Sequence, residues 1–456
     1  MQKDVDQLKA EIEQGVNIDS VTIKLNGIAL GAIRKNENNQ IIQYIEPVVQ
    51  AYREEVKSDL NEFGYLSYYL GLAHTNLGNY LNAIPFCEEA EFIAETKQEQ
   101  DTLLRMQRKI ILSHLYSSTG QLKKARQVNK EGLTLASALG NPIYEFRYLI
   151  NSGNTYQYMG EFNYALSHCK RAIEVVHQSL GDPALLAAAY TNMGASYLSS
   201  NQPEEAIKAL RKASGFDPNT NNENPEQIYD RLSTIIRYSD LAKAYTKLEV
   251  LDSAYIYANK AVTNIKEVFP DGHAFVGDFL LDLGIAYAKK GEFDQARERM
   301  KQSIAISDKS LGNVNIASGQ AYSNMADTYL EEEDYETAHD LYGKALGAVF
   351  KEYSSNVQGP DLLPSKDAVT ISPIDAISIL HKKAKAYEKE YNEDTSKSKL
   401  LQRTNETYTI IIHFIQRFKG DLNDVESRIL FSSTFKEIFG EAIASAQQLY
   451  VLEQND

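Results

Sequence analysis

The chain of 456 residues lacks tryptophan and contains only two cysteines, Cys87 and Cys169. Two cysteines are too few for a disulfide framework or a metal-ligand set built on thiolates. Basic residues are also scarce, because 47 Lys and Arg stand against 62 Asp and Glu and leave a net charge of −15. Nucleic-acid binding depends on a basic surface that neutralises phosphates, so this balance argues against a nucleic-acid partner.

Long apolar runs are missing as well. No stretch of about 18 apolar residues occurs, so we expect no membrane-spanning helix. The first eight residues carry charges where a signal peptide has an apolar segment. The protein is therefore expected to be cytoplasmic, or exported if a leader peptide has been removed. Apolar residues make up 43% of the chain, which is typical of a folded protein and excludes wholesale disorder.

A recurring pattern of small and aromatic residues is the strongest signal in the sequence. One copy reads Gly153, Tyr156, Gly160, Phe162 and Ala165. The alanines at the last of these places are Ala83, Ala125, Ala165, Ala206, Ala254, Ala296 and Ala338. Their successive intervals are 42, 40, 41, 48, 42 and 42 residues, which indicates seven copies of one structural unit.

Each unit is expected to be a pair of antiparallel helices. Small residues fit where two helices approach most closely, and a glycine such as Gly78 or Gly160 can end the first helix in the left-handed conformation. One pair cannot bury both of its faces, so neighbouring pairs must stack. The pattern over residues 66–350 resembles the tetratricopeptide repeat (TPR) family. This resemblance implies an all-α, right-handed superhelical solenoid with degenerate end repeats.

The repeats depart from the usual TPR pattern in two ways. Their period is longer than the usual ~34 residues, and breaks such as Leu139-Gly140 resemble the longer repeats of kinesin light chains and of bacterial multi-repeat sensors. The tryptophan that many TPRs carry early in the first helix is absent. In the seven repeats, the positions that correspond to this tryptophan hold Ser67, Lys109, Leu149, Tyr190, Tyr238, Leu280 and Tyr322.

The pattern also predicts the organisation of the chain. We expect N-terminal helices with an eroded capping repeat at residues 1–58, around Leu30-Gly31, and a seven-repeat solenoid at 59–352. A linker containing Pro and Gly follows at 353–373, and a degenerate repeat with a helical extension at 374–456. Inside the solenoid, the polar stretch 217–225 is expected to be a solvated loop.

The C-terminal segment carries a second resemblance. The stretches 408–418 and 427–450 resemble the helices that lie between TPR arrays and a CHAT domain, the caspase-like peptidase module of many bacterial proteins. The resemblance implies that the chain is the sensor or regulatory region of a fused or partner CHAT protease. The catalytic His and Cys motifs of that module have no counterpart in the sequence, so protease activity does not carry over to this chain.

Other catalytic motifs are missing too. The sequence has no Gly-rich phosphate loop, no Gly-x-Ser-x-Gly elbow and no His-Glu-x-x-His pair. His168 and Cys169 are adjacent in the sequence. Adjacent helical residues point about 100° apart, so these two side chains cannot form a catalytic dyad. His74 and Cys87 could approach each other, but both fall at packing positions. The acidic stretch 331–334 is interpreted as a solvated turn rather than a cation site. We therefore predict no enzymatic activity and no cofactor or metal in this chain.

One constellation favours binding. An Asn or Asp stands two residues before the small residue of the first helix in five consecutive repeats, where it is expected to line the concave groove. These residues are Asn151, Asn192, Asp240, Asp282 and Asn324, and Asn154 lies on the same side as Asn151. An amide both donates and accepts, so it can pair with a peptide unit without reading its side chain. In TPR proteins with this longer repeat, such a ladder grips an extended peptide.

The alternative for these residues is hydrogen bonding within or between helices. Two of them are Asp, which favours a ligand with N–H donors or positive charge. We therefore expect a non-catalytic scaffold that recognises a protein or an extended peptide in its groove. Two rivals remain. One is a peptide-pheromone receptor resembling bacterial Rap regulators, which place a small helical bundle before the repeats, and the other is a stand-alone assembly scaffold.

Overall fold

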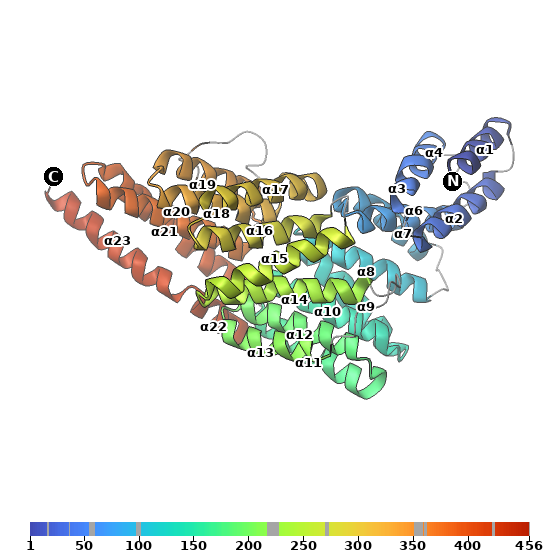
Figure 1. The fold of residues 1–456 in the computed structure, drawn as a ribbon, viewed down its shortest axis with the longest axis horizontal. Coiled ribbons are helices and arrows are strands. Elements are labelled where there is room, and N and C mark those ends of the chain that lie inside the picture. The colour runs from blue at the N-terminus through green and yellow to red at the C-terminus, as the bar shows by residue number, and fades with distance from the viewer. Residues whose placement is uncertain are drawn as a thin grey trace. The chain divides into compact units, whose positions relative to one another are not determined.

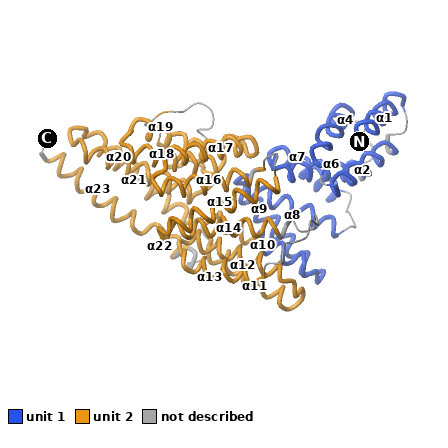
Figure 2. Tube along the Cα trace, viewed as in Figure 1, with its two compact units in different colours: residues 1–151 blue, residues 152–456 orange. Residues whose placement is uncertain are grey.

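The computed structural model describes residues 1–15, 18–35, 37–53, 60–96, 102–216, 228–269, 273–350, 359, 363–421 and 425–455. Most of these residues are helical, and among them the β-structure is limited to an isolated bridge between Phe350 and Thr370 (Figure 1). The chain divides into two compact units, residues 1–151 and residues 152–456 (Figure 2). The predicted loop at 217–225 and much of the predicted linker at 353–373 lie outside the described residues.

Unit 1 begins with short helical segments around a small apolar core. They are α1 (Gln2–Glu13), α2 (Ile18–Arg34), α3 (Asn38–Gln40), the π-helical η1 (Ile41–Ile45) and α4 (Glu46–Ala51). Val5, Leu25 and Ile45 are buried together in this core. A Cβ added at Gly31 would have no atom within 4 Å. The close helix approach of the regular repeats is therefore not made at this glycine of the predicted capping repeat.

Regular helix pairs follow in both units. Unit 1 contains α6 (Leu60–Asn76), α7 (Tyr80–Thr96), α8 (Thr102–Ser118) and α9 (Leu122–Ala138), and α10 (Pro142–Met159) runs from unit 1 into unit 2. Unit 2 continues with α11 (Phe162–Val175), η2 (Val176–Leu180), α12 (Pro183–Ser199), α13 (Pro203–Ser214), α14 (Ile228–Lys247), α15 (Leu251–Val268), α16 (Ala274–Lys289), α17 (Phe293–Leu311), α18 (Ile316–Glu331) and α19 (Tyr335–Val349). The seven predicted repeats are therefore helical hairpins.

The small residues of the pattern lie where the two helices of a pair touch. A Cβ added at Gly71 would lie 2.4 Å from the Sγ of Cys87, and one at Gly194 would lie 2.6 Å from the Cγ of Leu210. In both pairs the carbonyl oxygen of the repeat alanine, Ala83 or Ala206, would lie 3.4 Å from that Cβ. At these two glycines a Cβ would collide with the partner helix, which agrees with the steric reason inferred for the pattern.

The turn inside each pair has one geometry in all seven repeats. One residue takes the left-handed conformation: Gly78, Gly120, Gly160 and Gly291 at φ 71–79°, and Asn201, Glu249 and Glu333 at φ 58–62°. The next amide donates to the carbonyl five residues earlier, as from Glu161 to Tyr156 at 2.9 Å. This is the Schellman arrangement that closes a helix. Three of the seven turns adopt it without glycine, which costs more backbone strain.

The C-terminal helices of unit 2 extend the array and then return to the first repeat of this unit. They are α20 (Pro373–Glu393), α21 (Ser398–Asp421), α22 (Val425–Thr434) and α23 (Lys436–Asn455). α20 and α21 form an eighth helix pair, and α22 contacts α11 of the first repeat in this unit. A Cβ added at Gly160 would lie 3.1 Å from Phe431 and 3.5 Å from Ile374. The turn after α10 thus packs against residues more than two hundred positions away.

Candidate functional site

The first helices of successive pairs form one layer in unit 2. Helices α12, α14, α16, α18 and α20 each contact the next. Asn192, Asp240, Asp282 and Asn324 lie on four of these helices at equivalent repeat positions. Asn154 lies on α10 within the same unit, whereas Asn151 is the last residue of unit 1. The structure therefore places five of the six predicted site residues in one unit.

A residue that the sequence reasoning missed occupies the same position in the eighth pair. Lys382 precedes Ala384 by two residues, and its Nζ donates to the Oδ1 of Asn324 at 3.1 Å. The same Nζ lies 2.7 Å from the Oδ2 of Asp327. The signal was present in the sequence, because Ala384 and Tyr387 repeat the small-to-Tyr spacing. The row of polar residues therefore continues to α20 and becomes basic there.

The asparagines of the row use their donors inside the protein. The Nδ2 of Asn192 donates to the carbonyl of Ala188 at 2.8 Å, and that of Asn324 donates to Gln320 at 2.8 Å. The Nδ2 of Asn151 donates to Ile110 at 3.3 Å. These are bonds within and between helices, as the alternative interpretation expected. The Oδ1 of Asn192 has no partner among the described residues, so it remains able to accept a hydrogen bond.

The two aspartates of the row lie on either side of one lysine. The Nζ of Lys243 is 3.4 Å from Asp282 Oδ2 and 3.7 Å from Asp240 Oδ1. The hydroxyl of Ser239 also donates to Asp282. Asp278 precedes Asp282 by one turn of α16. Asp240 is only 5% exposed, and its Oδ2 has no hydrogen-bond partner. We call Asp240, Asp278 and Asp282 the aspartate cluster.

Burial controls the titration of this cluster. Desolvation raises the pKa of Asp240 and of Asp278 to about 6, against the opposing effect of Lys243. The pKa of Asp282 is also raised by burial, and Lys243 and Ser239 moderate that rise. Burial alone would lower the pKa of Lys243, but the three carboxylates hold it above its usual range. Electrostatic attraction therefore keeps the lysine charged, while two of the acids titrate close to neutral pH.

Tyr158 on α10 interacts electrostatically with the cluster. Its side chain on α10 is 39% exposed, yet desolvation by surrounding protein raises its pKa to about 12. Charges on Asp278, Lys243 and Asp375 also act on the tyrosine. These groups come from α16, α14 and α20, which are far from α10 in the sequence. Charged groups on helices of separate repeats thus act on the same tyrosine in unit 2.

The two cysteines and their neighbouring histidines are packing residues. Burial raises the pKa of Cys87 and of Cys169 to about 12, which removes the thiolate needed for nucleophilic attack. The Nε2 of His74 lies 2.9 Å from Glu46 Oε2, and its ring stacks on Phe86. Burial also favours the neutral form of His168, whose pKa is lowered. The geometry assembles no cysteine–histidine dyad at either of these places.

The acidic turn at 331–334 is engaged in structural contacts. Glu332 pairs with Arg297, and the Asp334 side chain accepts from the amide of Thr337 at 3.1 Å as the N-cap of α19. Over the described ranges, no group of three or more His, Cys, Asp or Glu side chains is arranged to hold a metal ion. In the same ranges no helix is long and apolar enough to cross a membrane.

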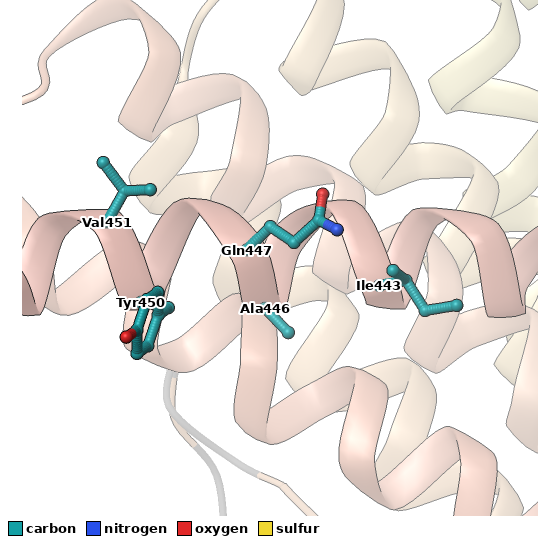
Figure 3. Close-up of a pocket in the computed structure, with 5 residues that line it drawn as sticks. All are labelled: Ile443, Ala446, Gln447, Tyr450 and Val451. Atoms are coloured by element: carbon teal, nitrogen blue, oxygen red, sulfur yellow. The ribbon is translucent and has the colours of Figure 1, made fainter.

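An open apolar face lies on α23. Ile443, Ala446, Gln447, Tyr450 and Val451 line a shallow hollow along this single helix (Figure 3). Ile443 and Tyr450 are 61% and 64% exposed. The face offers one amide and one phenol as polar groups, so it lacks the converging polar side chains that orient a ligand. The layer around the aspartate cluster is therefore the stronger candidate.

Sequence comparison identifies the repeat. A profile of the tetratricopeptide repeat family matches residues 144–218 and 275–348. Protein KINESIN LIGHT CHAIN-RELATED 3 of Arabidopsis thaliana is 23% identical over 287 residues, which are 60% of this chain and 42% of that protein. The chain thus spans less than half the length of this curated relative. The predicted TPR repeats are confirmed, and the matched segments are a repeat scaffold rather than an enzyme domain.

Structural comparison supports the same fold. A Rap protein complexed with competence and sporulation factor shares 15% identity at a TM-score of 0.52, over 72% of this chain and 97% of that chain. The apo quorum sensor NprR from B. thuringiensis shares 16% identity at 0.52, over 75% and 91%. NprR in complex with its cognate peptide NprX shares 15% at 0.51, over 68% and 85%. At these identities the likeness establishes the predicted all-α TPR solenoid and nothing further.

Proposed function

We propose that the layer of first helices in unit 2 binds an extended peptide, either free or as part of a partner protein. One observation carries the proposal: a row of polar residues runs through this layer at one repeat position, and two of its acceptor atoms lack partners. These atoms are the Oδ1 of Asn192 and the buried Oδ2 of Asp240. Asn192 is half-buried, so its Oδ1 is available to a hydrogen-bond donor of a ligand.

The chemistry of the row suits a peptide main chain. The amide nitrogens of Asn192 and Asn324 donate to their own helices. The Oδ1 of Asn192 can therefore still accept a hydrogen bond from a ligand. A peptide in extended conformation presents N–H groups that such acceptors can bind. Each hydrogen bond contributes about 0.5–1.5 kcal/mol net, so several must form in register. The Rap protein is complexed with competence and sporulation factor, and NprR with its cognate peptide NprX; both share this fold, which supports this choice of ligand.

An alanine substitution in the row tests the proposal. We expect Asn192→Ala to weaken binding of a peptide that co-purifies with the chain by about three- to tenfold, because it removes the acceptor that is free for a ligand. Asn264→Ala is the matched control, because Asn264 on α15 makes the same bond to the carbonyl four residues earlier, at 2.8 Å. Calorimetric titration measures the affinities. Unchanged affinity together with a lower melting temperature would show that the row is structural.

A narrower proposal is that peptide binding regulates a CHAT protease. Its support is the resemblance of residues 374–456 to the helices that precede that domain, together with the return of α22 to α11. Through this return, a change in curvature at the peptide layer would reach the C-terminal helices. The test is the peptidase activity of a CHAT partner with the chain, in the presence and absence of peptide. A peptidase activity that changes with neither the chain nor the peptide would reject this role.

The receptor and scaffold alternatives differ in what they bind. The helical segments α1 to α4 ahead of the repeats favour a receptor with an N-terminal effector region, as in the Rap resemblance. A receptor must bind a short free peptide with full affinity, whereas an assembly scaffold requires a folded partner. Comparing a co-purified partner with short synthetic peptides taken from it distinguishes the two.

A further inference from the structure

We propose that the aspartate cluster is a subsite for one cationic side chain, arginine or lysine, of the bound peptide. The inference rests on the proposed function, because it names the peptide chemistry that the same layer selects. It places the peptide's positive charge beside Asp240 and Asp278, on the side not satisfied by Lys243.

The balance of charge in the cluster leaves room for a second cation. Three carboxylates face the single ammonium of Lys243. That ammonium lies closer to Asp282, at 3.4 Å, than to Asp240, at 3.7 Å. Asp282 also accepts from Ser239, whereas Asp278 has neither a hydrogen bond nor an ion pair within the described residues. Asp240 and Asp278 are therefore the carboxylates of the cluster with fewer partners.

The burial of Asp240 makes its open oxygen informative. The residue is 5% exposed, so water can reach little of its carboxylate, yet Oδ2 has no partner. A buried acceptor without a partner is costly, and a donor from a ligand would remove that cost. The neighbouring acid on α20 behaves differently, because Asp375 accepts from Gln320 at 2.7 Å and from Ser372. The open acceptor is thus a property of Asp240 and not of every acid in this region.

The surroundings favour an organic cation over a metal ion. Among the residues that the structure describes, no acidic group converges closely enough to hold a metal, and Lys243 lies between the two acidic helices. A guanidinium carries five donors on a plane and can reach carboxylates on different helices, and an ammonium carries three. Tyr158 adds an aromatic ring from α10, and such rings attract cations. These features match a basic side chain held between helices.

The titration of the cluster gives the direction of the pH effect. The groups that act on Asp240 and Asp278 are Lys243 and Asp282, with Tyr158 and Asp375 facing them from α10 and α20. Because burial raises the pKa of both acids to about 6, they lose charge as the pH falls through 6. A cation bound there is then attracted less, so its affinity must fall between pH 7 and pH 5.

The test compares a positive side chain with a neutral one of the same shape. The probes are capped peptides of about nine residues, alternating glycine and serine, with either arginine or citrulline at the centre. Each is titrated into the full chain at pH 7 by calorimetry. We expect the arginine peptide to bind about tenfold more tightly, since charged hydrogen bonds exceed neutral ones by about that factor. Asp240→Asn and Asp278→Asn should each remove most of this preference.

Controls separate this inference from the proposed function. Asp294→Asn is the matched variant, because Asp294 is fully exposed on α17 and its carboxylate lies 3.9 Å from an arginine; it should keep the tenfold preference. A circular-dichroism melt verifies that Asp240→Asn is folded. Equal binding of both peptides, or a preference that survives both cluster variants, would overturn the cation subsite while leaving peptide binding intact. Failure of both peptides to bind would overturn both proposals.

Discussion

Units 1 and 2 use the same helix packing but differ at one repeat position. This position lies two residues before the small residue of the first helix in each pair. In unit 1 the first two repeats carry Tyr69 and Ile111 there, and the first polar residue is Asn151 at its end. In unit 2 the position holds Asn192, Asp240, Asp282, Asn324 and Lys382. The packing positions hold small residues in both units, whereas this position holds Tyr69 and Ile111 in unit 1 and mostly Asn and Asp in unit 2. The difference teaches that the same helix packing can carry bulky apolar or aromatic residues at this position in one region and a row of polar residues in another.

Substitutions at the close helix contacts that both units share should have the largest effect on stability. Gly71→Ala in unit 1 and Gly194→Ala in unit 2 would place a methyl group 2.4 and 2.6 Å from atoms of the partner helix. Overpacking of this kind costs about 1–3 kcal/mol. Urea unfolding followed by circular dichroism measures the free energy of each variant.

Gly31→Ala is the control for these two variants. Its Cβ would meet nothing within 4 Å, so replacing a helical glycine should stabilise unit 1 by about 0.5–1 kcal/mol. If Gly71→Ala and Gly31→Ala had the same effect, the close approach at Gly71 would not be the reason for that glycine.

The buried Asp240 of the polar row should destabilise unit 2 in a pH-dependent way. Burial raises the pKa of Asp240 from 3.8 to about 6, so its contribution to stability is fully present below pH 4 and is lost as the pH rises through 6. Asp240→Asn should therefore be more stable than the natural chain at pH 7.5, by about 1–2 kcal/mol. This difference in stability between the two proteins should disappear below pH 4. Thermal unfolding at both pH values measures it, and a gap independent of pH would contradict the assignment.

The turns provide the smallest and most local test. Glu249 adopts φ 59° without being glycine, whereas Gly291 takes φ 78° at the same place in the next repeat. Glu249→Gly should stabilise the protein by about 0.5–1 kcal/mol, and Gly291→Ala should destabilise it by about 1 kcal/mol. Differential scanning calorimetry detects both as opposite shifts in melting temperature. Shifts of the same sign would mean that the two turns differ in more than their residue type.

Much of the fold was predictable because its causes are local in the sequence. The spacing from Gly153 to Ala165 recurs since every pair meets the same steric demand, and it revealed the repeats and their helices. The turns at Asn201, Glu249 and Glu333 carry no glycine, but the intervals between alanines still located them. The predicted domain boundaries and the peptide-binding role of the row stay predictions.

The site was predictable only in part. Repeat spacing identified Asn192 and Asp282, and the same spacing applied to Ala384 would have found Lys382. The open acceptor of Asp240 could not be predicted, because it depends on where Lys243 and Ser239 direct their donors. The proximity of Tyr158 to Asp278 depends on the curvature of several stacked pairs, which no short stretch of sequence encodes.

The sequence by itself determined the helix pairs, their turns and the polar row, because contacts within one pair involve residues only a few turns apart. Tertiary structure alone decided which acids share one lysine, which oxygen is left without a donor, and that α22 returns to the turn after α10. The physical reason is that small rotations between neighbouring pairs accumulate along a solenoid. Their sum determines which distant side chains meet in unit 2.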